Sequence, residues 1–376
     1  MRNCKFYQYK IIEKLGGIMK KLVLILSFFF MLSLIGPAQE FIENPKKPLS
    51  KNAGRVLQLE EVFRITDKSG DFYFNAPVNL KVDSEGNFFI IDDNQILKFS
   101  ADGKFLKNLF KKGQGPGEIS TRYHWGLSYF LLKDEITLHD SDGNKIIRMD
   151  DEGNLIEEIK LKTTRLQKMY GPTDHGFIFM NESPANIGPT GFRDVDMSII
   201  LVSKDGGDSR IVMVFPKKVY SGKTFGMDWD KFFALFDSKT QQIFVSHTGE
   251  YKIVSADLST GQIIRSFNRK YSRAKYVMPE ALKKFYEKSN IERPERKYEN
   301  DILGLFFHKD HLWVKTSTKD EKKGVLIDVF SREGKYIDSF YLDLKGELMA
   351  VQGDSIFVSE RDEDENIQIV KYKIIE

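Results

Sequence analysis

Ten polar or aromatic residues stand in short segments just before apolar runs, and their types suit the binding of a polar ligand. Amides and carboxylates exchange hydrogen bonds with such a ligand, guanidinium and imidazole groups bind anions, and indole rings offer a flat apolar surface. The candidates are Asn75, Asn79, Arg122, His124, Trp125, Asp228, Trp229, Asp230, Asn300 and Asp301. Whether they form one site depends on the elements that position them.

No local motif for catalysis accompanies these residues. The sequence has neither the Gly-x-Ser-x-Gly turn of α/β-hydrolases nor the His-Glu-x-x-His pattern of common zinc proteases. The segment Gly222-Lys223-Thr224 looks like the end of a phosphate-binding loop, but the glycine required five positions earlier is Lys217. No catalytic residue is therefore predicted.

The six histidines are too dispersed for a structural zinc site. His139 and His247 fall near the ends of equivalent strand-like runs, and His308 and His311 flank a turn. Most of them are therefore expected to be exposed hairpin residues, and no cofactor is predicted.

Two other local patterns have structural interpretations. The acidic run 360–366 lacks the glycine and the terminal glutamate of the twelve-residue calcium loop, so a solvated hairpin turn is favoured there and at residues 140–144. The glycine-rich segment 113–118 could cradle an anion, but no helix follows it and Pro116 removes one donor. It is interpreted as a tight crossover between repeats, where glycine permits positive φ.

The elements that must position the candidates are short strands in a repeat. After residue 50 one signature recurs, in which about four strand residues are followed by a mostly polar residue. Its six copies begin at Phe88, Ile136, Phe177, Ile243, Leu312 and Ile356. Glycine hairpins follow most copies. Six such units predict an all-β, six-bladed propeller, an architecture that hides sheet edges by radial repetition.

The ring is expected to close with an N-terminal strand that joins the last blade. The sixth copy has no hairpin after it, so residues 56–65 are predicted to pair with the strand ending at Ile375. Two spacings between copies, 66 and 69 residues, are too long. The excess lies near residues 217–228 and at 272–299, where Pro279 predicts the start of a short helix. This helix is expected to be a surface decoration or a flap over one mouth of the ring.

The first 38 residues are interpreted as a leader. Met19-Lys20-Lys21 is basic, residues 22–35 form an apolar run, and small residues follow at 36–38. The run is shorter than the ~20 residues of a membrane-spanning helix. The expected organisation is an extension at 1–18 from a misassigned start, a signal peptide at 19–38, a linker at 39–54 and the propeller at 55–376. The product is expected in the periplasm or outside the cell, without membrane insertion after cleavage.

Most of the excess positive charge belongs to this leader. The chain carries a formal charge of +3, but residues 1–38 hold six basic side chains and one acidic side chain, which leaves 51 basic and 53 acidic side chains, or −2. Because the rest of the chain is nearly neutral, its charge does not predict binding to nucleic acid or to an anionic membrane. The only cysteine, Cys4, also lies in the leader, so no disulfide is expected.

The first repeat resembles a known family. Asn75-Ala76-Pro77, residues 82–87, residues 96–99 and the glycine-rich segment 113–118 resemble the six-bladed β-propeller family of exported bacterial proteins, related to NHL repeats. Residues 328–335 of the fifth repeat are also typical. The resemblance covers most of residues 55–376 and implies the fold far more than a function, because propellers host unrelated activities.

In a propeller the segment before each innermost strand surrounds one mouth of the ring, and the ten candidates fall in such segments. We therefore predict a secreted or periplasmic binding propeller that holds a glycan, a peptide or a partner protein. Alternatively, the candidates are loop residues that cap turns, with the tryptophans packed between blades. The alternative function is an enzyme that resembles gluconolactonase-like hydrolases or NHL-type lyases, with a divalent metal such as Ca²⁺ held in the channel by dispersed ligands.

Overall fold

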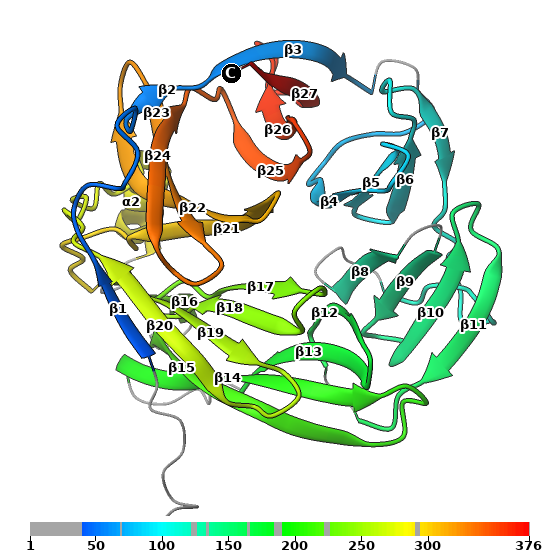
Figure 1. Ribbon diagram of the computed structural model, residues 1–376. Coiled ribbons are helices and arrows are strands. Elements are labelled where there is room, and N and C mark those ends of the chain that lie inside the picture. The colour runs from blue at the N-terminus through cyan, green and yellow to red at the C-terminus, as the bar shows by residue number, and fades with distance from the viewer. Residues whose placement is uncertain are drawn as a thin grey trace, which may run out of the picture. The chain divides into compact units, whose positions relative to one another are not determined.

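In the part of the chain that the structure describes, the fold consists of six separate β-sheets and one helix (Figure 1). The computed structural model describes residues 40–67, 70–121, 126–132, 135–163, 166–183, 190–221, 226–289 and 294–375. The leader at 1–38, the segment Gly222-Lys223-Thr224 and the candidates Arg122, His124 and Trp125 lie outside the described residues.

Each of the first three predicted repeats forms one sheet, which we call a blade. Blade one contains β4 (Val78–Val82), β5 (Phe88–Asp92), β6 (Gln95–Phe99) and β7 (Phe105–Asn108). Blade two contains β8 (Leu127–Leu132), β9 (Glu135–Asp140), β10 (Lys145–Asp150) and β11 (Leu155–Lys160). Blade three contains β12 (Lys168–Thr173), β13 (Gly176–Glu182), β14 (Gly191–Ser203), β15 (Ser209–Ser221) and β16 (Gly226–Asp228).

The last three blades each receive a strand from the N-terminal part of the chain. Blade four contains β17 (Phe233–Asp237), β18 (Gln242–Ser246), β19 (Ile253–Asp257), β20 (Ile263–Arg269) and β1 (Glu40–Asn44). Blade five contains β21 (Ile302–His308), β22 (His311–Asp320), β23 (Gly324–Ser331), β24 (Tyr336–Leu342) and β2 (Arg55–Val56). Blade six contains β25 (Glu347–Gln352), β26 (Ser355–Arg361), β27 (Ile367–Ile375) and β3 (Gln58–Ile65).

The blades are arranged in a ring with the first strand of each blade innermost (Figure 1). Neighbouring innermost strands contact one another from β4 through β8, β12, β17, β21 and β25 and back to β4. In β5, the second strand of blade one, all five residues are buried. A strand covered on both faces is apolar at consecutive positions, which is the physical origin of the repeated signature. The predicted six-bladed propeller is confirmed.

β3 is the outer strand of blade six. It pairs antiparallel with β27, with Gln58 opposite Ile375 at one end. This is the pairing expected for residues 58–65, but Val56 lies in β2, which runs parallel to β24 and places Val56 beside Tyr341 of blade five. The segment therefore covers the edges of two blades in succession, and the polar backbone groups of both edges are paired.

Residues 41–57, which we call the strap, follow the outer edges of blades four and five in place of the expected linker. The buried side chain of Asn44 joins these blades. Its Nδ2 donates to the carbonyl oxygens of Asn268 and Gly334, at 2.9 Å each, and its Oδ1 accepts from the N–H of Tyr336 at 2.9 Å. Further N–H groups of the strap donate to carbonyl oxygens of β24. The strap therefore forms hydrogen bonds with backbone groups at the blade edges that would otherwise have to bond to water.

The insertion after β20 contains α2 (Glu280–Ser289), which begins directly after Pro279. Tyr286 is buried, whereas the neighbouring Phe285 is 51% exposed, so only one of these two aromatic side chains packs against the protein. The other long spacing is taken up by β14 and β15, each of 13 residues. The glycine-rich segment 113–118 connects β7 to β8 as the expected crossover, and residues 362–366 form the turn between β26 and β27.

His139 is buried, which corrects the expectation of an exposed hairpin residue. It is 0% exposed and packs roughly perpendicular to Phe179 of blade three, with ring centroids 4.9 Å apart. Neither ring nitrogen has a hydrogen-bond partner among the described residues. Burial lowers the pKa of His139 to about 4, and the charge of Asp140 opposes this only in part. The neighbouring blade covers the strand end, and a local sequence pattern does not report that contact.

Folding stability should fall on acidification because of His139. Its folded pKa of about 4 lies below the ordinary value of 6.5, so the unfolded chain binds the proton more readily and stability is lost as the pH falls from 6.5 toward 4. This site should account for a loss of about 2 kcal/mol between about pH 7.5 and pH 5. Urea unfolding at both pH values should show a smaller loss for His139→Leu and the full loss for His175→Leu, which alters an exposed histidine. Equal losses in the wild type and His139→Leu would contradict the assignment.

Candidate functional site

Asn75 and Asn79 have structural roles in blade one. The N–H groups of Asn75 and Ala76 donate to the carboxylate of Asp92, at 2.8 and 2.9 Å, and tie the segment before β4 to the end of β5. Asn79 lies at a bulge of β4 with a φ of 54°, and its carbonyl oxygen accepts from the Tyr129 hydroxyl at 2.7 Å. The observed contacts of these two residues position a turn and a strand, which agrees with the alternative interpretation that the candidates are structural loop residues.

Blade two repeats the carboxylate cap with Asp140. Its carboxylate accepts from the N–H groups of Ser120 and Thr121, at 2.8 and 3.1 Å. Although burial opposes ionisation, these hydrogen bonds lower the pKa of Asp140. Asp140 is 0% exposed, so the expectation of a solvated turn at 140–144 is wrong for this residue. In blade three, Asn181 accepts in the same way from the segment before β12. In these three blades the polar residue that ends the signature is therefore a structural cap.

Of the other five described candidates, Asp228 ends β16 of blade three, and the remaining four lie in the segments that lead into blades four and five, on the face of the ring at which the innermost strands begin. We call it the mouth face. Trp229 and Asp230 lead into β17, and residues 300–301 lead into β21. Beside them lies a pocket of about 470 Å³, which we call the mouth-face pocket. Its lining includes Trp229, Asp230, the loop 248–250 between β18 and β19, and residues 295–298 of the insertion.

Asn300 and Asp301 are buried and join the loops around this pocket. The Oδ1 atom of Asn300 accepts from the N–H of Lys231 at 3.1 Å, and its Nδ2 donates to the carbonyl oxygen of Trp229 at 3.3 Å. Asp301 accepts from Nε of Arg273 at 2.9 Å. Burial raises the pKa of Asp301, and the Arg273 charge opposes that rise. Both residues therefore position the pocket and do not line it.

The two acidic residues around Trp229 differ in their surroundings. Asp228 accepts from Nζ of Lys217 at 2.8 Å and does not line the mouth-face pocket. Asp230 does line it, and burial raises its pKa, whereas the N–H groups of Lys218 and Gly249 lower it. Of the seven candidates that the structure describes, only Trp229 and Asp230 therefore line this pocket.

Trp229 and Arg296 both line the mouth-face pocket and stack on each other. The guanidinium carbon of Arg296 lies 4.9 Å from the Trp229 ring centroid and 5.5 Å from that of Tyr276. Phe192 packs roughly perpendicular to the indole, with centroids 4.7 Å apart. Among the described residues, Arg296 donates only from Nε to the carbonyl oxygen of Tyr298, at 2.9 Å. Burial lowers the pKa of Arg296. A guanidinium therefore stacks on the indole ring that the sequence predicted to be an open apolar surface.

Sequence reasoning did not single out Arg273, Arg296 or Tyr298, because all three belong to the insertion. Arginine and tyrosine residues there indicate a binding site only if the insertion is known to lie at a mouth of the ring. The flap interpretation of residues 272–299 would have supplied that placement, since Arg273 and residues 295–298 line the pocket.

Within the described ranges, no group of three or more His, Cys, Asp or Glu residues could hold a metal ion. In the same part of the chain, no helix is long and apolar enough to cross a membrane.

Comparisons with known proteins agree with the ring of six sheets. Residues 69–225 match the model of the family DUF5128, described as a 6-bladed beta-propeller. No curated protein matches the chain in sequence. A Bacteroides fragilis protein described as exported aligns with a TM-score of 0.52 at 12% identity, over 89% of this chain and 100% of its own. A member of the DUF4221 family from Bacteroides vulgatus aligns with a TM-score of 0.52 at 12% identity, over 85% of this chain and 99% of its own.

A gluconolactonase from Xanthomonas campestris aligns with a TM-score of only 0.44 at 12% identity, over 88% of this chain and 97% of its own. Likeness at that level carries no argument about activity. The sheet order, the family match over blades one to three and the two Bacteroides structures together show that the chain has the six-bladed β-propeller fold.

Proposed function

We propose that the protein is an exported, non-catalytic binding propeller that holds an acidic peptide segment in its mouth-face pocket. The leader pattern and the description of one structural neighbour support export. One observation carries the ligand class: the Arg296 guanidinium stacks on Trp229 at 4.9 Å, with a backbone carbonyl as its only acceptor among the described residues. A guanidinium held in this way presents a planar fork of donors that matches a carboxylate.

The rest of the lining favours a peptide over a neutral glycan. Lys218 and Lys297 add positive charge, and Glu250 and Glu295 add negative charge. A peptide offers N–H donors to the carboxylates and carboxylate or carbonyl acceptors to the cations. Because the charges nearly balance, long-range steering is weak and specificity arises from contacts at short range.

Replacing Arg296 should weaken the binding of acidic peptides. Arg296→Met removes a charge-assisted contact that contributes about 1.5–3 kcal/mol, so the affinity should fall roughly 10- to 100-fold. Arg296→Lys should also bind more weakly, because lysine lacks the planar fork and its stacking on Trp229. The purified protein is first applied to an array of peptides paired as Asp or Glu against Asn or Gln, and the tightest peptide is then titrated by calorimetry.

The matched control is Arg361→Met, which removes an exposed arginine of blade six and should leave the affinity unchanged. A glycan array measured in parallel tests the competing ligand class. Glycan binding with a blank peptide array would refute the proposal. Unchanged peptide affinity in a folded Arg296→Met variant would do the same.

A further inference from the structure

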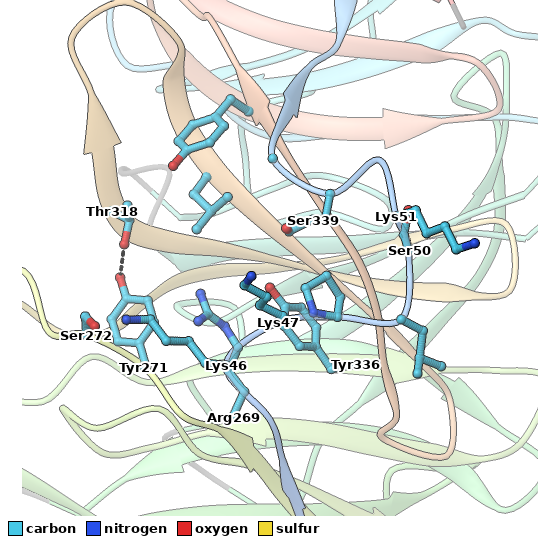
Figure 2. Close-up of a pocket in the computed structure, with 16 residues that line it drawn as sticks. Lys46, Lys47, Ser50, Lys51, Arg269, Tyr271, Ser272, Thr318, Tyr336 and Ser339 are labelled. Carbon is cyan, nitrogen blue, oxygen red and sulfur yellow. Dashed lines mark hydrogen bonds between the residues drawn. The ribbon is translucent and has the colours of Figure 1, made fainter.

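A second pocket, of about 630 Å³, lies where the strap passes blades four and five (Figure 2). Residues 46–54 of the strap form one side, and residues 269–272 with side chains from β22, β23 and β24 form the other. We call it the strap pocket. Its volume falls within the ~300–1,000 Å³ range of small-molecule sites. It shares no lining residue with the mouth-face pocket.

The strap pocket is lined by cationic side chains and by no acidic one. Lys46, Lys47 and Lys51 come from the strap, and Arg269 comes from the end of β20. The three lysines are exposed, and their ammonium groups make no ion pair with the described residues. Several like charges around one concave surface focus a positive field, which favours an anionic ligand.

Arg269 is held in the pocket wall by a buried cluster. Only 8% exposed, it donates from Nε to Asp328 at 2.6 Å. Its guanidinium carbon lies 4.7 Å from the Tyr271 ring centroid and 5.2 Å from that of Tyr336, and Figure 2 shows these two rings on either side of it. Its Nη2 atom donates to none of the described residues. This fixed guanidinium is a preorganised donor for a ligand in the pocket.

The tyrosines of the strap pocket offer hydroxyl groups and few open ring faces. Arg269 covers Tyr271 and Tyr336, and the Lys323 ammonium lies 5.4 Å from the Tyr341 ring centroid. The Tyr271 hydroxyl shares a hydrogen bond of 2.7 Å with Thr318, drawn dashed in Figure 2. The lining also includes the hydroxyl groups of Ser50, Ser272 and Ser339. A nucleotide base needs an open aromatic face for stacking, whereas a sugar is recognised through hydroxyl groups.

We propose that the strap pocket binds an acidic saccharide. The strap lysines and Arg269 hold its carboxylate or sulfate group, and the serine, threonine and tyrosine hydroxyls exchange hydrogen bonds with the sugar. Because most of the charge comes from exposed lysines, added salt should weaken binding. This site is independent of the mouth-face pocket, so either proposal can fail without the other.

Calorimetric titration with three oligosaccharides tests the proposal. Trigalacturonate carries carboxylates, a chondroitin sulfate disaccharide also carries a sulfate, and maltotriose is neutral. At least one acidic probe should bind and maltotriose should not, and comparison of the acidic probes distinguishes carboxylate from sulfate recognition. Binding of neither acidic probe, or equal binding of maltotriose, would overturn the proposal.

A pair of charge variants locates the binding on the protein. Lys46→Gln/Lys47→Gln should weaken the acidic probe about tenfold or more, because two ammonium contacts are lost. The matched control, Lys283→Gln/Lys284→Gln, removes the same charge from exposed residues of α2 and should bind like the wild type. Tyr271→Phe should also bind more weakly, since it removes one hydroxyl and keeps the ring under Arg269. Wild-type affinity in the strap double variant would place the ligand elsewhere and overturn the assignment.

Discussion

A chain that begins at Asp67 should fail to form the folded ring, because it lacks both the strap and β3. Ile65 belongs to the buried cluster shared by blades six and one, and Phe63 stacks on Phe88 of blade one with ring centroids 5.8 Å apart. Leu59 packs against the cluster of blades five and six. Each such side chain contributes ~1.5–3 kcal/mol when fully buried, so their joint loss approaches the 5–15 kcal/mol total stability of a domain. The outer edge of β27 would also be left open for aggregation.

Circular dichroism and size-exclusion chromatography should show this loss against a chain that begins at Glu40, which retains β1, β2 and β3. A pair of point variants localises the effect. Phe63→Ala should lose about 3 kcal/mol, whereas Val62→Ala should lose less than about 1 kcal/mol. Val62 lies on the same strand but is 52% exposed. A chain from Asp67 that stays soluble and melts like the longer one would refute closure by β3.

Asp328→Asn should destabilise the fold by about 3–5 kcal/mol, because it leaves the Arg269 charge buried without a counterion. The wild-type carboxylate is fully buried and accepts from Arg269 at 2.6 Å and from the hydroxyls of Tyr251 and Tyr336 at 2.7 Å each. Asparagine has the same shape, but the N–H groups of its amide would face the N–H and O–H donors of Arg269 and the two tyrosines. Urea unfolding at neutral pH measures the change in the free energy of unfolding.

The double variant Arg269→Met/Asp328→Leu should recover much of this loss, because it removes both buried charges. As a control, Asp354→Asn removes one partner of the exposed Lys309–Asp354 pair, which is 3.1 Å apart, and should cost less than about 1 kcal/mol. The assignment of Asp328 as the counterion fails if Asp328→Asn costs no more than Asp354→Asn.

Both proposed pockets lie where the chain departs from its repeat. The strap is added to the outer edges of blades four and five, and residues 270–300 are added between these blades on the mouth face. The repeated strands form the rigid ring, and the added segments supply much of each pocket lining. Binding residues carried by irregular segments on a rigid scaffold are a common arrangement in proteins.

The sequence by itself determined the number of blades and the strand that closes the ring. Consecutive apolar residues such as those of β5 indicate a strand that is buried on both faces, and each short run of the repeat shows this pattern. Six copies of that run, and a seventh apolar segment without a partner, were sufficient to place residues 58–65 on β27. The helix after Pro279 was likewise readable from local residue types.

Only the tertiary structure decided which polar residues are structural and which line a pocket. Asn44 bonds to Gly334, 290 positions away, and Arg296 covers Trp229 although the two belong to different connecting segments. His139 is buried by a ring from the next blade, and the backbone beside Asn75 is held by Asp92. Local composition reports whether a residue favours burial or a turn, whereas these contacts depend on how distant segments pair, which is set by the register and packing of the whole ring.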